Sequence, residues 1–108
     1  MNLDLPASIA LFFSLGKKPD PQQIAQAFNT DAVVHDEGHV WRGQADILAW
    51  LRAAHAKYDF IATPLTVHPG PNGIAVQARV TGNFPGGDVQ LDYAFAIEDG
   101  RISELRIQ

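Results

Sequence analysis

The hydrophobic periodicity of this 108-residue chain changes halfway along it, and that change restricts the fold more than any other feature. Residues 44–58 place Ile47, Leu48, Leu51 and Ala54 at helical spacing, and Trp50 borders the same face. From residue 60 onward the apolar period is two, and turn sequences rich in Gly, Pro and Asp separate the stretches. Helices followed by strands predict an α+β fold, with helices packed on one side of a mainly antiparallel sheet.

Start and stop signals divide the chain into further elements. Helices are predicted over 7–15 and 21–28, the first with Asp4 as a plausible cap and the second with Asp20 as N-cap and Pro21 in its first turn. Strands are predicted over 31–36, 40–42, 60–67, 74–84, 89–97 and 101–107. The expected architecture is a single domain, residues 1–108, with two or three helices on a curved sheet of about five strands.

Charge and composition exclude several classes of protein. Eight Lys and Arg against twelve Asp and Glu give a net charge of −4, which argues against binding to nucleic acid or to anionic membranes. The chain has no cysteine, so disulfides and thiolate catalysis are excluded. The longest apolar run, 9–15, is far shorter than the ~20 residues that span a bilayer. No secretory signal pattern opens the chain, so cytoplasm is the expected location.

The strand predicted over 89–97 has two different faces. One carries the bulky apolar set Val89, Leu91, Tyr93, Phe95 and Ile97. The other carries the small and polar set Gln90, Asp92, Ala94 and Ala96. Because helices cover only one side of such a sheet, we interpret the bulky set as the outer face. This interpretation predicts a homodimer through sheet faces and gives Tyr93 a dimer contact.

The segment 28–50 resembles a known superfamily. It contains the run Asp31-Ala-Val-Val-His-Asp36, a turn at Gly38, then Trp41-Arg-Gly43 and the start of the long helix. This order resembles the nuclear-transport-factor-2-like superfamily, and more closely its branch of SnoaL-like polyketide cyclases and ketosteroid isomerases. The resemblance implies a cone-shaped fold in which helices close the wide end of a bent sheet over a pocket, and it often comes with homodimers. The same fold carries enzymes, ligand binders and docking modules.

The resemblance also implies a pair of carboxylates. Asp36 stands where isomerases of this fold have their base, and Asp92 stands where they have a protonated acid that stabilises the enolate. Phe12 stands where they have a tyrosine, and losing one such donor typically costs ~10²–10³ in rate. A strict steroid isomerase is therefore disfavoured, while cyclase-type proton transfer without a cofactor is retained. The pocket walls that would raise the pKa of the acids are Phe12, Phe28, Trp50 and Ala94.

Simpler roles remain open for both acids. Asp36 could begin the 37–38 turn by accepting backbone N–H groups. Asp92, disfavoured in mid-strand, could form a structural ion pair with an arginine. The candidate partners are Arg42, Arg79 and Arg106. Arg42 could instead orient a ligand carboxylate, and Tyr58 is a further candidate hydroxyl donor.

The four histidines do not predict a metal site. His35 and His39 flank the turn, but strand alternation places His35 on the face opposite Asp36. His55 is expected to interact with the dipole at a helix C-terminus, and His68 belongs to a turn.

Three hypotheses for function follow. The first is a small enzyme that acts on an apolar carbonyl compound through Asp36 and Asp92. The second is non-catalytic binding of an apolar small molecule, and the third is a dimeric protein-docking domain. The first hypothesis requires both carboxylates to point into one cavity.

Overall fold

Residues 4–16, 18–70 and 73–108, which the computed structural model describes, form three helices and six strands. The helices are α1 (Ala7–Ser14), α2 (Pro21–Ala27) and α3 (Gln44–Tyr58). The strands are β1 (Phe28–Asp36), β2 (His39–Arg42), β3 (Ile61–Gly70), β4 (Gly73–Thr81), β5 (Asp88–Glu98) and β6 (Arg101–Ile107). The helices follow the predicted ranges closely, and α3 coincides with the predicted 44–58.

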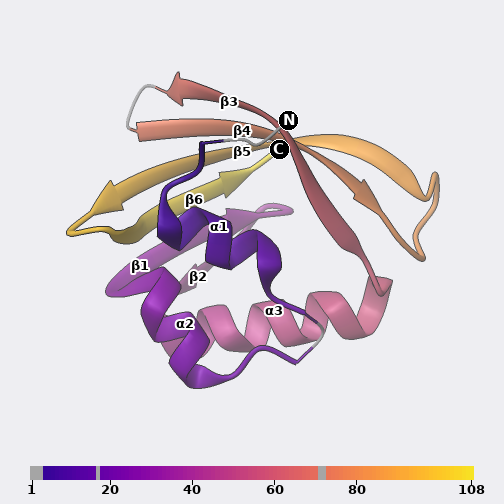
Figure 1. Cartoon of the computed structure of the whole chain (residues 1–108). Coiled ribbons are helices and arrows are strands. Elements are labelled where there is room, and N and C mark those ends of the chain that lie inside the picture. The colour runs from indigo at the N-terminus through magenta and orange to yellow at the C-terminus, as the bar shows by residue number, and fades with distance from the viewer. Residues whose placement is uncertain (1–3, 17, 71–72) are drawn as a thin grey trace.

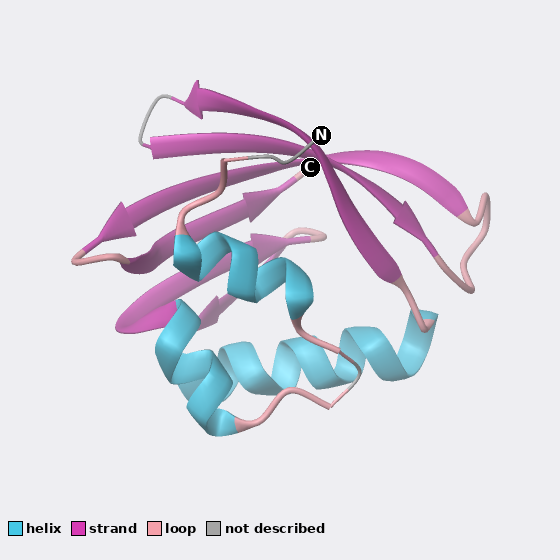
Figure 2. Cartoon of the chain, in the orientation of Figure 1, coloured by secondary structure: helices cyan, strands magenta, loops and turns pink. Residues whose placement is uncertain are grey.

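All six strands belong to one sheet, in the order β2-β1-β6-β5-β4-β3. Neighbouring strands are antiparallel except β1 and β6, which run parallel. Figure 1 shows the sheet bending around the three helices, which all lie on its concave side. Figure 2 shows the same division into a helical layer and a curved sheet layer. The predicted α+β fold is therefore confirmed, with a sheet that is mixed rather than wholly antiparallel.

The start of α2 has the local chemistry that the sequence predicts. Asp20 accepts a hydrogen bond from the backbone N–H of Gln23 at 2.8 Å, and the Gln23 side chain accepts one from the backbone N–H of Asp20 at 3.0 Å. This reciprocal capping box satisfies two donors that the first helical turn leaves without partners. The expected cap of α1 is different, because Pro6 rather than Asp4 occupies that position and makes no side-chain bond.

Replacing Asp20 with Ala should lower the free energy of unfolding by about 1 kcal/mol, because the N–H of Gln23 loses its acceptor. Thermal or urea unfolding monitored by circular dichroism measures the change. Asp20→Asn is the matched control, since an amide oxygen can still accept that bond. An equal loss in both variants would contradict the capping role.

The core lies between the helices and the concave face of the sheet, and it includes the bulky side chains of β5. Tyr93 is only 4% exposed and Phe95 only 2%, whereas Asp92 and Ala94 are exposed. The interpretation that the bulky set of β5 faces outward was therefore wrong. Alternation separates the two sets of side chains but does not say which set faces the helices. The homodimer stays a prediction, but the bulky side chains of β5 no longer support it, because they are buried in the core.

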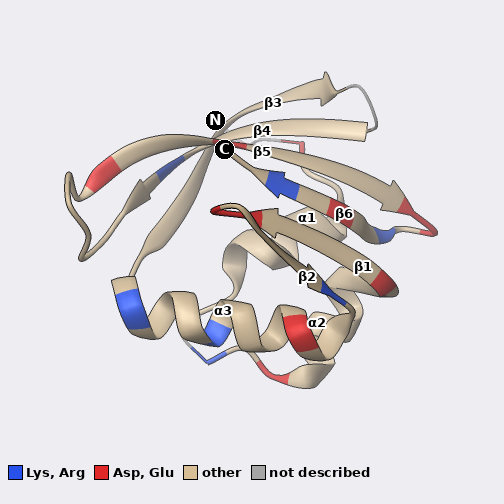
Figure 3. Cartoon of the chain, turned by 180° about the vertical axis from the view of Figure 1, so that it is seen from behind, with Lys and Arg blue, Asp and Glu red and all other residues tan. Residues whose placement is uncertain are grey.

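The surface of the chain carries charges of both signs. Figure 3 shows Lys and Arg interspersed with Asp and Glu over strands, helices and turns. Within the described residues, none of the helices combines the length and the apolar character that crossing a membrane requires.

Candidate functional site

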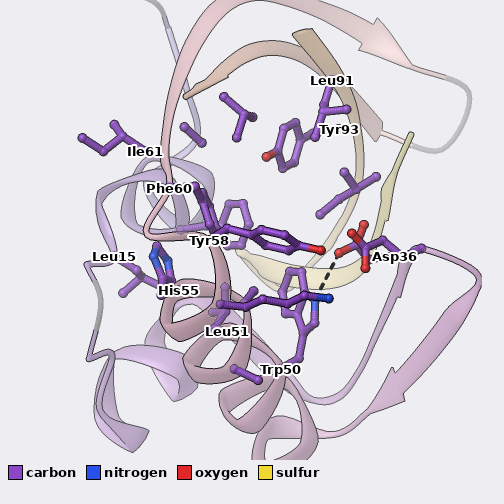
Figure 4. Close-up of a pocket in the computed structure, with 18 of the residues that line it drawn as sticks. Leu15, Asp36, Trp50, Leu51, His55, Tyr58, Phe60, Ile61, Leu91 and Tyr93 are labelled. Atoms are coloured by element: carbon purple, nitrogen blue, oxygen red, sulfur yellow. Dashed lines mark hydrogen bonds between the residues drawn. The ribbon is translucent and has the colours of Figure 1, made fainter. Parts of the chain in front are cut away.

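A cavity of about 970 Å³ opens between the helices and the concave face of the sheet. Its walls come from α1, α3 and the strands β2 to β5, with the ends of β1 and β6 at one side. Figure 4 shows side chains from these elements converging on one space. Eight aromatic side chains line it: Phe12, Phe13, Trp41, Trp50, Tyr58, Phe60, Phe84 and Tyr93. A cavity of this volume and lining suits a largely apolar small molecule.

Asp36 introduces a carboxylate into this apolar space. It is the last residue of β1, just before a tight turn in which Glu37 and Gly38 both have positive φ (52° and 77°). The turn returns the chain as β2, which pairs Asp36 with His39. Burial raises the pKa of the Asp36 carboxyl above its ordinary value, and the hydrogen bond from Trp50 opposes that rise in part.

Trp50 holds the Asp36 side chain in place. The indole Nε1–H of Trp50 donates a hydrogen bond to Oδ2 of Asp36 at 3.2 Å. Trp50 is 7% exposed, and its indole contacts Phe12, stacked at a centroid distance of 6.5 Å, and Trp41 at 5.7 Å. The backbone N–H of Glu37 also donates a hydrogen bond to the Asp36 carboxylate, as the simpler turn-forming role considered for this residue requires.

Replacing Trp50 with Phe should raise the pKa of the Asp36 carboxyl further, because the variant removes a hydrogen bond that favours the charged form. A titration followed by the ¹³C chemical shift of the carboxyl carbon measures it. Trp41→Phe is the control, since the bond to Asp36 comes from Trp50. An unchanged pKa in Trp50→Phe would contradict the role of this hydrogen bond.

Two tyrosines bring hydroxyl groups to the same cavity. Tyr93 packs its ring against Phe13 at a centroid distance of 5.0 Å and against Phe95 at 6.3 Å. Burial and the nearby negative charge of Asp36 raise the pKa of Tyr93 well above its ordinary value, so its O–H stays protonated at neutral pH. Figure 4 shows the hydroxyl ends of Tyr58 and Tyr93 and the carboxylate of Asp36 directed into the cavity.

The structure brings together some of the predicted site residues and separates others. Asp36, Phe12 and Trp50 line the cavity. Phe28 does not, because it is fully buried behind Phe12, with the two rings edge to face at 5.9 Å. Ala94 lies on the opposite face of the sheet, together with Asp92.

Asp92 is exposed on that outer face, beside a shallow groove that it shares with His68, Gln77 and Ala94. Its backbone pairs with Gln108. The requirement that both carboxylates point into one cavity is therefore not met. The placement of Asp92 in the cavity was wrong for the same reason as the assignment of the bulky β5 set to the outer face. Asp92 and Tyr93 are adjacent in a strand, so their side chains must point in opposite directions. Tyr93 takes the place in the cavity that the sequence interpretation assigned to Asp92.

The arginines considered as partners for Asp92 bind elsewhere. Arg79 forms an ion pair with Asp88, and Arg106 approaches Glu104 at 3.5 Å. Arg42 is exposed at the end of β2 and does not line the cavity within the part of the chain that the structure describes.

The histidines are distributed over different surroundings. Nε2 of His35 lies 3.1 Å from Oε2 of Glu104, on the face opposite the Asp36 side chain, as alternation predicts. His39 lines the cavity near Asp36. His55, in the last turn of α3, is buried and stacks on Phe60 at a centroid distance of 4.1 Å. No group of three metal-ligating side chains occurs among the described residues.

Helices on the concave side of a bent sheet, enclosing a mostly apolar cavity, define a small pocket-containing domain of the nuclear-transport-factor-2-like fold. The family model of the SnoaL-like domain matches residues 10–105, and the chain belongs to that family. The predicted superfamily is therefore confirmed. A search of curated proteins finds no match.

Solved structures agree with this assignment. A protein from Sinorhizobium meliloti that carries the provisional name polyketide cyclase is 39% identical, with a TM-score of 0.89, over 97% of this chain and 96% of that one. A ketosteroid isomerase-like fold from Catenulispora acidiphila, in complex with trimethylamine, has a TM-score of 0.83 at 14% identity, over 97% of this chain and 86% of that one. A SnoaL-like protein from Jannaschia, also provisionally named a polyketide cyclase, has a TM-score of 0.77 at 18% identity, over 99% and 90%. The last two similarities concern the fold alone.

Proposed function

We propose that the cavity binds an apolar carbonyl compound and that Asp36 moves a proton at the carbon next to the carbonyl. The observation that carries the proposal is a half-buried carboxylate, held by the indole N–H of Trp50 and the backbone N–H of Glu37, facing a cavity with mainly apolar walls. The similar protein from Sinorhizobium meliloti, with its provisional name of polyketide cyclase, supports the same class of reaction.

The proposed step needs only groups that this chain supplies. The carboxylate of Asp36 accepts the proton as the C–H bond of the ligand breaks. The electron pair of that bond forms the carbon–carbon double bond of an enolate, and the carbonyl oxygen takes the negative charge. Asp36 then returns the proton to the same carbon or to another carbon of the ligand. A carboxyl whose pKa is raised above its ordinary value is better suited to both halves of this cycle than an unperturbed one.

Tyr93 is the proposed donor to the enolate oxygen. Its hydroxyl stays protonated and faces the cavity, so it can donate a hydrogen bond without giving up its proton. It would supply the kind of group that is missing at Phe12, where the isomerases that the sequence resembles have a tyrosine. Since Asp92 lies outside the cavity, this proposal gives it no role.

The test is exchange of carbon-bound protons for deuterium. 2-Tetralone, an apolar ketone that the cavity volume accommodates, is dissolved in D₂O with the protein, and loss of the ¹H NMR signals next to the carbonyl is followed. We expect the protein to accelerate exchange above the buffer rate. Binding without acceleration, seen as a change in tryptophan fluorescence, would overturn the catalytic proposal and favour the non-catalytic binding that the sequence left open.

A further inference from the structure

We infer that the cavity also binds apolar amines as their ammonium ions, with Asp36 as the counter-ion and the surrounding aromatic rings as the cage. This inference does not rest on the proposed proton transfer, because it concerns binding of a cation rather than chemistry on a carbonyl. It names a second class of ligand for the same space, namely a tertiary or quaternary ammonium attached to an apolar ring system.

The first argument is the unbalanced charge of Asp36. Among the described residues no Lys or Arg forms an ion pair with Asp36, and the donors to its carboxylate, the indole of Trp50 and the backbone N–H of Glu37, are both neutral. A carboxylate removed from water without a cation is unfavourable, which is why burial raises its pKa. A ligand that brings its own positive charge into the cavity compensates that cost, whereas a neutral ligand of the same shape does not.

The second argument is the aromatic lining beside the carboxylate. Trp41, Trp50 and Tyr58 line the cavity around Asp36, and Trp41 also packs against His39. Aromatic faces attract alkylammonium groups through the ring quadrupole, most strongly where water is excluded. The ring of Tyr58 already holds a cation in this way, since Nζ of Lys57 lies 4.9 Å from its centroid.

The other charged and titratable groups around Asp36 do not remove this preference. Glu37 is adjacent and adds negative charge, and Tyr93 stays neutral. His39 attracts the Asp36 charge only weakly. Lys57 also lines the cavity, but its side chain is fully exposed, so solvent screens its charge, and Tyr58 and Glu37 attract it. The strongest electrostatic preference inside the cavity is therefore for a cation.

The experiment compares two probes of the same shape. N,N-Dimethyl-2-aminotetralin is an ammonium at neutral pH, and 2-isopropyltetralin replaces its charged nitrogen with carbon. Fluorescence reports binding directly, because the two tryptophans of the chain, Trp41 and Trp50, both line the cavity. From a charge-assisted hydrogen bond and the cation–π contact, we expect the ammonium to bind about thirtyfold more tightly than the carbon analogue.

Two matched variants assign the effect to Asp36. Asp36→Asn should abolish the preference for the ammonium, whereas Asp92→Asn, with the same change of charge on the outer face, should leave it intact. Equal affinity for the two probes, no binding of either, or an equal loss in both variants would overturn the inference.

The pH dependence of the native protein provides a test that needs no variant. Affinity for the dimethylamino probe should fall at acid pH as Asp36 becomes protonated, and at alkaline pH as the amine loses its proton. The N,N,N-trimethyl analogue has a permanent charge. Its affinity should therefore still fall at acid pH but should not fall at alkaline pH. An affinity that does not change with pH would contradict the role of Asp36 even if Asp36→Asn failed to fold. Amine binding with no exchange of 2-tetralone would leave this inference standing and refute the proposed reaction alone.

Discussion

Asp36→Asn is expected to lower the rate of α-proton exchange in 2-tetralone by about 10²–10⁴-fold, the range usually lost with a general base. The amide has nearly the same shape and can still accept the indole N–H of Trp50, so the cavity keeps its form. It cannot accept a proton from carbon at neutral pH. Exchange rates measured by NMR at equal protein concentration give the ratio directly.

The control for this prediction is Asp92→Asn. Both variants remove one negative charge, but Asp92 lies on the outer face of the sheet and outside the cavity. Its exchange rate should equal that of the native protein. If Asp92→Asn lost activity as strongly as Asp36→Asn, the two-carboxylate interpretation of the sequence would return, and the assignment of proton transfer to Asp36 with Tyr93 would fail.

A loss through unfolding can be separated from a loss of chemistry. The folded-state pKa of Asp36 is raised, so its contribution to stability is fully present at acid pH and is lost as the pH rises through that value. In Asp36→Asn the stability does not fall as the pH rises, because the amide does not ionise. The variant should therefore unfold at a temperature equal to or above that of the native protein at neutral pH, measured by circular dichroism.

Phe28→Ala is expected to reduce the free energy of unfolding by about 3–5 kcal/mol, the largest stability effect we predict for a single substitution. Phe28 joins α2 to β1, is fully buried, and contacts the ring of Phe12 edge to face. Truncation removes most of this apolar surface and leaves a cavity that neither the strand nor the helix can close. Urea unfolding with linear extrapolation measures the change.

Two comparison variants make this prediction specific. Phe28→Leu keeps much of the volume and should cost less than Phe28→Ala. Ile61→Ala removes an apolar side chain that is 67% exposed and should change stability only slightly. A similar effect of Ile61→Ala and Phe28→Ala would show that burial of Phe28 does not control stability.

Phe28 also affects the site that it does not line. Its ring supports Phe12, the Phe12 ring stacks on Trp50, and the Trp50 indole holds the carboxylate of Asp36. The loss of support in Phe28→Ala should therefore weaken the orientation of Asp36 in whatever fraction of the variant remains folded.

The local elements could be predicted closely because short-range chemistry specifies them. The N-cap at Asp20 and the apolar spacing within α3 act over a few residues, and both are present in the structure. The tight turn after Asp36 also followed from its residues, with Gly38 in a positive-φ conformation that glycine adopts at little cost.

The structure brings only some of the predicted site residues to the cavity. Asp36, Phe12 and Trp50 line the cavity, but Phe28, Asp92 and Ala94 do not. For β5, one wrong choice between two faces placed Asp92 inside and Tyr93 outside. The bulk of the apolar set Val89, Leu91, Tyr93, Phe95 and Ile97 was the available signal, because large apolar side chains belong to the core before they belong to an interface.

The amino-acid order by itself determined the helices, the strands and the alternation of side chains, because these depend on neighbours within a few positions. Only the tertiary structure decided which side of β5 meets the helices and that Asp36, Trp50 and Tyr93 share one cavity. That choice depends on how a bent sheet and three helices together remove the most apolar surface from water. The bulk of the β5 side chains favours one face, but no local pattern brings Asp36, Trp50 and Tyr93 into one cavity, because they come from different elements that meet only in the packed structure.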